Sequence, residues 1–184
     1  SITSQWFSTP TPRVSNSLFI IPPADLSINE IQSSNLLDTI DPSGVTGPVE
    51  IFGAHEDWLE IVNNEDVPVD LAGYYLTDRL NQPMKWQFPL GIPDSTVIQP
   101  GEFKLIWADE DNSQGWNHTN FKFNSSGEVI VLRSVDGFSI ADSVHFNVIP
   151  ADHSWGRNPD ATGPWRIFFT GSPTPEYGNG PFNP

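Results

Sequence analysis

Hydrophobic residues recur at every second position within short segments of this chain. In residues 57–63, Leu59 and Ile61 fall on one face of an extended backbone, and residues 103–108 repeat the alternation. A period of two is typical of β-strands rather than helices. The same pattern predicts further strands at residues 118–123, 128–133, 138–146 and 165–169.

Turn-forming residues divide these segments. The chain has 18 Pro and 14 Gly, and Val135-Asp136-Gly137 has the composition of a hairpin turn. One segment, residues 26–37, is compatible with a helix, but it alternates equally well and we interpret it as a strand. Many short strands separated by turns predict an all-β fold, a sandwich or a barrel.

The charge balance narrows the choice of partners. The chain carries 23 Asp and Glu against 8 Lys and Arg, a net charge of -15. Such a surface repels phosphate backbones and anionic lipids, so we expect no nucleic acid partner. The apolar runs are too short to cross a bilayer, so we expect no membrane insertion. The absence of Cys excludes disulfides and thiolate chemistry.

A short motif occurs twice. Pro-Thr-Pro, then three residues, then Asn, stands at residues 10–16 and again at residues 173–179, each time after an aromatic residue. We interpret residues 1–24 as a linker or as the tail of a preceding similar unit, and residues 25–184 as one domain. Coincidence between two proline-rich loops is the alternative.

Several segments, in order, resemble the lamin-tail domain family. They are residues 27–31, 57–63, 68–78, 85–89, 100–109, 118–122, 126–128 and 142–144, followed by 154–160, Trp165 and 173–175, which are similar to the bacterial branch. The resemblance implies an immunoglobulin-like β-sandwich. Residues 35–54 form a longer insertion than the family pattern needs. The coiled-coil rod and basic segments of nuclear lamins are missing, so their DNA contacts are not expected here.

The resemblance implies a non-catalytic binding, scaffolding or targeting module of a larger secreted or cell-surface bacterial protein, with a protein or a glycan as partner. A hydrolase using carboxylates or a bound metal is the main alternative. Glu30, Asp57 and Glu60 are its candidate carboxylates, chosen only because acids are abundant. No nucleophile motif is present, and no His pair has metalloprotease spacing. His118 is expected to make a structural hydrogen bond.

An acidic loop follows the strand predicted at residues 103–108. Asp109, Glu110 and Asp111 offer hard oxygen ligands that suit Ca²⁺. The loop is not an EF-hand, because Gln114 stands where that loop needs Gly. A polar turn stabilised by backbone hydrogen bonds is the simpler interpretation.

Seven Trp are many for 184 residues, and burial explains those in predicted strands. Trp116 differs, because it lies in a polar loop, and it is therefore the candidate for glycan binding; packing against a neighbouring loop is the alternative. Gly156-Arg157, followed by Asn158-Pro159-Asp160, is interpreted as a turn that positions the guanidinium for an ion pair across the sandwich, and anion binding is the alternative.

Overall fold

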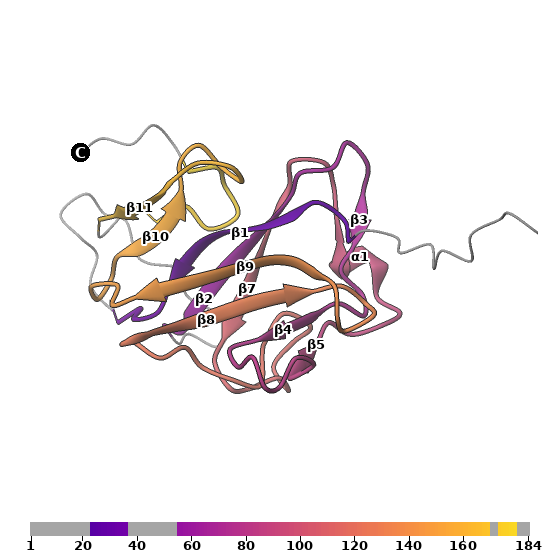
Figure 1. Ribbon diagram of the computed structural model, residues 1–184, viewed down its shortest axis with the longest axis horizontal. Helices are drawn as coiled ribbons and strands as arrows, with labels where there is room; N and C mark the ends of the chain where they lie inside the picture. Colours follow the sequence, from indigo (N-terminus) through magenta and orange to yellow (C-terminus); the bar gives the residue numbers. More distant parts are fainter. Residues whose placement is uncertain (1–22, 37–54, 170–172, 180–184) are drawn as a thin grey trace, which may run out of the picture.

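The computed structural model describes residues 23–36, 55–169 and 173–179. Two antiparallel sheets face each other in this part of the chain (Figure 1). The larger sheet has the order β11 (Trp165–Phe168), β10 (Ser154–Arg157), β1 (Leu26–Gln32), β2 (Asp57–Asn63) and β7 (Phe103–Ala108). The smaller sheet has the order β5 (Trp86–Gln87), β4 (Tyr75–Thr77), β8 (Gly127–Arg133) and β9 (Ile140–Asn147).

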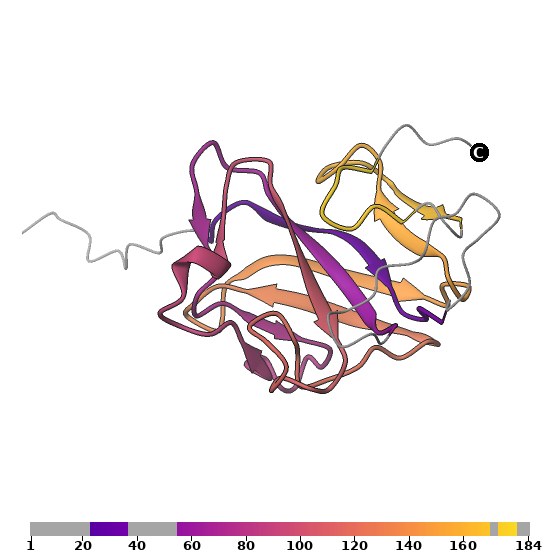
Figure 2. The ribbon, with the colours of Figure 1, turned by 180° about the vertical axis from the view of Figure 1, so that it is seen from behind.

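Small elements close one end of the sandwich. β3 (Val69–Asp70) pairs with β6 (Val97–Ile98), and α1 (Pro93–Thr96) lies directly before β6. From behind, β1, β2 and β7 lie in front of β8 and β9 (Figure 2). Among the described residues, no helix is long and apolar enough to cross a membrane.

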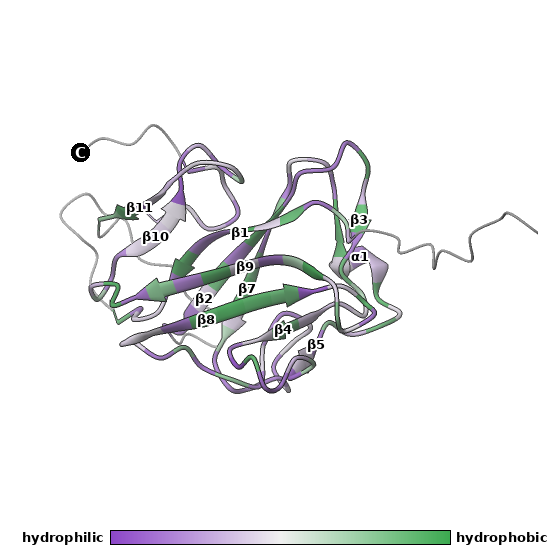
Figure 3. Cartoon of the chain, viewed as in Figure 1, coloured by the Kyte–Doolittle hydropathy of each residue, from purple (hydrophilic) through white to green (hydrophobic). Residues whose placement is uncertain are grey.

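The core lies between the two sheets. Ile28 of β1 and Ile61 of β2 contribute to it from the larger sheet, and Leu132 and Phe146 contribute from the smaller one. Figure 3 shows the hydrophobic stretch of β8, from which Ile130 and Leu132 join this core. Burial of apolar surface between the layers is the main stabilising contribution to such a sandwich.

The outer face of the larger sheet is also covered. Every residue of β1 is buried, including the polar ones, although a two-layer sandwich normally leaves one face of each sheet in water. Residues 173–179, which we call the strap, lie over this face and form hydrogen bonds with Glu30 and Glu60. The strap and β10 lie together beside β1 (Figures 1 and 2).

Most strand predictions are confirmed. β1, β2, β7, β8, β9 and β11 lie where the alternation predicts them, and the chain reverses between β8 and β9 at Gly137, whose φ is 72°. The strand prediction for residues 26–37 is confirmed over Leu26–Gln32.

One strand prediction is wrong, and one turn prediction is wrong in part. Residues 118–123 form only isolated bridges, such as Trp107 with His118, because the Thr119 hydroxyl donates to the Phe121 carbonyl and closes a local turn. In the turn predicted at residues 156–160, Gly156 and Arg157 instead belong to strand β10, because both pair with β11, and only residues 158–160 form a bend and turn. The first Pro-Thr-Pro copy lies outside the described residues, as do most of the linker and most of the insertion at 35–54.

Candidate functional site

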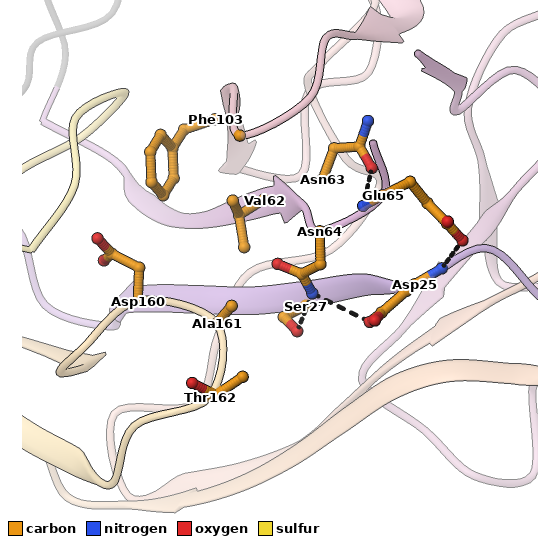
Figure 4. A pocket seen from close by; sticks show the side chains of 11 residues that line it. Asp25, Ser27, Val62, Asn63, Asn64, Glu65, Phe103, Asp160, Ala161 and Thr162 are labelled. Carbon is orange, nitrogen blue, oxygen red and sulfur yellow. Dashed lines mark hydrogen bonds between the residues drawn. The ribbon is translucent and has the colours of Figure 1, made fainter. Parts of the chain in front are cut away.

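A pocket of about 540 Å³ opens on the outer face of the larger sheet (Figure 4). Ser27 of β1 and Val62 of β2 form its floor, and Phe103, at the start of β7, stands at one side. Residues 160–162, from the loop between β10 and β11, form the opposite wall. This volume lies within the range of small-ligand sites.

Hydrogen bonds hold the polar lining in place. The Asn64 amide donates to the Ser27 hydroxyl over 2.8 Å and to the Asp25 carboxylate over 3.1 Å. The Glu65 carboxylate in turn accepts the Asp25 backbone N–H at 2.8 Å, and Figure 4 shows these contacts. The rim is therefore organised before any ligand arrives, which lowers the entropic cost of binding.

Carboxylates set the charge of the pocket. Asp25, Glu65 and Asp160 line it, whereas no Lys or Arg is among its described lining residues. An anionic ligand would be repelled there. Carboxylate oxygens accept hydrogen bonds, so the lining suits a neutral ligand with several hydroxyl donors, and the Phe103 ring offers an apolar face.

Asp160 joins this pocket to the strap. Its Oδ1 accepts the Asn29 amide at 3.0 Å and the Asn179 backbone N–H at 2.8 Å. A Cβ on Gly178 would lie 2.7 Å from the other oxygen of Asp160 and 3.8 Å from the Phe103 ring. The strap therefore passes closely along the pocket wall.

The acids beneath the strap have altered acidities. Burial raises the pKa of Glu30 to about 7, against hydrogen bonds from Ser154 and Thr174 that favour its charged form. Burial also raises the pKa of Glu60 to about 9, with the nearby negative charge of Glu30 acting in the same direction. With pKa values this high, the two carboxyls together hold at least one proton at neutral pH.

Asp57, the third carboxylate candidate, lies elsewhere. Burial and the neighbouring Glu56 raise its pKa to about 7. Asp57 and Glu60 are three positions apart in β2, so their side chains lie on opposite faces. The structure therefore brings Glu30 and Glu60 together, covered by the strap, and leaves Asp57 apart.

The acidic loop after β7 uses its carboxylates internally. Asp109 is buried and accepts a hydrogen bond from the His118 ring and another, at 3.0 Å, from the Asp111 backbone N–H. Asp111 accepts hydrogen bonds from Ser113 and Gln114. Glu110 is exposed. Among the described residues, no group of three or more His, Asp or Glu is arranged to hold a metal ion.

Trp116 lies at a second, smaller depression of about 370 Å³. It packs against the core cluster, and it shares the depression with Trp86, Gln87 and Asn112. An aromatic ring beside side-chain amides suits a sugar face, although Trp86 is only 6% exposed.

The ion pair predicted for Arg157 is confirmed within a strand. Its Nη2 lies 3.2 Å from Asp142 of β9, and its Nε donates to the Ile28 carbonyl at 3.0 Å. Sequence reasoning missed the pocket residues Asp25, Phe103 and Asp160. The repeated Pro-Thr-Pro motif was the one signal in that region, because its second copy is the strap.

The domain is therefore an immunoglobulin-like β-sandwich, in which the outer face of the larger sheet is covered. The family model of the lamin tail domain matches residues 21–147, and the chain belongs to that family. β10, β11 and the strap lie beyond the matched residues. No curated protein and no solved structure matches the chain.

Proposed function

We propose that this lamin tail domain is a non-catalytic binding module of a larger secreted or cell-surface bacterial protein, and that the pocket in Figure 4 binds a neutral glycan. The observation that carries the proposal is the combination of hydrogen-bonded carboxylates, an aromatic ring and no basic side chain in that lining. Domains of this family generally serve as interaction modules.

The raised pKa values of Glu30 and Glu60 are explained by burial, so they are not by themselves evidence of catalysis. A carboxyl that acts as a catalytic acid or base must lie within reach of the substrate. Here Glu30 and Glu60 line neither the pocket nor the Trp116 depression, and both accept hydrogen bonds from the strap.

Calorimetric titration with a panel of neutral oligosaccharides tests the proposal. Binding to the wild type that falls at least tenfold in Phe103→Ala, and persists in Trp116→Ala, supports the pocket. If binding is lost only in Trp116→Ala, the binding site is the second depression rather than the pocket. If the folded protein binds no member of the panel, the proposal of a glycan ligand is contradicted, and a protein is left as the proposed partner.

The hydrolase alternative is tested with the same oligosaccharides. Release of reducing ends by the wild type, abolished in Glu60→Gln, would establish catalysis and overturn the non-catalytic account. We expect no release above a buffer control, because the strap covers the carboxyl pair.

A further inference from the structure

The strap occupies a site that is built to receive it. Glu30 of β1 accepts the Thr174 backbone N–H at 3.3 Å and the Thr174 hydroxyl at 3.1 Å. Glu60 of β2 accepts the backbone N–H of Glu176. Both glutamates are fully buried, so these donors replace water that the carboxyls have lost.

The end of the strap is recognised through Asn179. Its side-chain amide donates to the Arg157 carbonyl at 2.8 Å, and its amide oxygen lies 2.8 Å from the Thr174 hydroxyl, whose single proton it shares with Glu30. A Cβ on Gly156 would lie 2.8 Å from that amide nitrogen, so the strand is shaped for this close approach. Thr and Asn, five positions apart, are thus the side chains that the site recognises.

Residues 10–16 have the same recognisable groups. Thr11 and Asn16 correspond to the Thr and Asn of the strap, within the same Pro-Thr-Pro frame. Arg13 stands where the strap has Glu176, and it is the only charged side chain in residues 1–22. Residue 176 is exposed, so a positive side chain at that position would face outward and complement the net charge of -15.

We infer that the Glu30–Glu60–Asp160 site is a docking site for segments of the form Pro-Thr-Pro-x-x-x-Asn, and that residues 10–16 of a second copy of this chain are its partner. Docking requires the strap to leave. Ser15 replaces Gly178, and its Cβ would fall 2.7 Å from Asp160, so that carboxylate must shift. This inference does not depend on the ligand proposed for the pocket.

The test uses the full chain with its strap loosened by Thr174→Val and Asn179→Ala, and a synthetic peptide of residues 7–16. Because a ligand of the folded state raises the melting midpoint, about 1 mM peptide should raise the midpoint of this variant. The peptide carrying Thr11→Val and Asn16→Ala should bind at least tenfold more weakly. The wild type, with its site filled, should respond less. If the double variant does not fold, Asn179→Ala alone replaces it.

A folded variant that ignores the native peptide, or responds equally to the substituted one, overturns the inference. Sedimentation then distinguishes docking of residues 10–16 onto a second copy of the chain from docking onto their own domain. The loosened variant should self-associate with rising concentration, and Asn16→Ala introduced into it should abolish the association. Peptide binding without self-association would place residues 10–16 on their own domain and overturn the assignment to a second copy.

Discussion

Glu30 and Glu60 are cross-strand partners in β1 and β2, and both carboxyls are fully buried beneath a strap from the far end of the chain. Two like charges opposite each other would destabilise a sheet. Burial raises the pKa of both acids, and the strap supplies donors to each of them. The pair therefore fastens the strap to the sandwich.

Loss of the Thr174 hydroxyl should loosen the strap. Thr174→Val keeps the shape of the side chain but removes a donor to the buried Glu30. We expect a loss of about 1–3 kcal/mol in the free energy of unfolding, because the buried Glu30 carboxyl loses one of its hydrogen bonds where water cannot replace it. Chemical denaturation measures it, and Thr162→Val, on an exposed loop residue, is the matched control. Equal stability of the two variants would contradict the role of Thr174.

We expect the missing side chain of Gly156 to be needed for the close packing of the strap, rather than for the conformation of β10 itself. In Gly156→Ala the new Cβ would meet the Asn179 amide at 2.8 Å and Glu30 at 3.2 Å, so we expect a destabilisation of about 1–3 kcal/mol. The reason is tested by a double-mutant cycle with Asn179→Ala, which removes the closest clashing atom. Purely additive effects would show that the clash lies elsewhere.

The sequence predicts the core strands well and the outer face poorly. β2 was predictable because its alternation puts Leu59 and Ile61 on one face. The same alternation puts Glu60 on the other face, which would ordinarily be exposed to water. Its burial depends on a segment far away in sequence: Thr174 and Glu30 are 144 positions apart. Local patterns carry no signal for such a contact.

The candidate site was predictable only in fragments. Abundant acids led to Glu30, Asp57 and Glu60, but only packing decides which of them meet. Asp25 and Asp160 line the same pocket although they are far apart in the sequence. Trp116 was noticed because its loop is polar, and the structure places it beside Trp86.

Calcium should leave the melting temperature unchanged. The Asp109 carboxylate is engaged by His118 and by a backbone N–H of its own loop, so binding an ion there would require breaking these contacts. Melting curves with Ca²⁺ and with EDTA check this expectation, because a ligand of the folded state raises the midpoint. A rise with Ca²⁺ that EDTA reverses, and that Asp111→Asn abolishes, would restore the acidic loop as a calcium site.

That Glu30 and Glu60 are held as a buried pair with raised pKa values beneath the strap is tested most directly by the melting temperature between about pH 5 and pH 9. Both acids have a raised pKa in the folded state, to about 7 and about 9, so the folded protein binds more protons than the unfolded one in this range. Stability is therefore greatest on the acid side and falls as the pH rises.

Glu60→Gln removes one titrating group, and the slope, rather than the absolute stability, is its readout. We predict that the melting temperature of the wild type falls across this range, that Glu60→Gln flattens the fall, and that Glu110→Gln, on an exposed loop residue, keeps it. A Glu60→Gln profile parallel to that of the wild type would contradict the account.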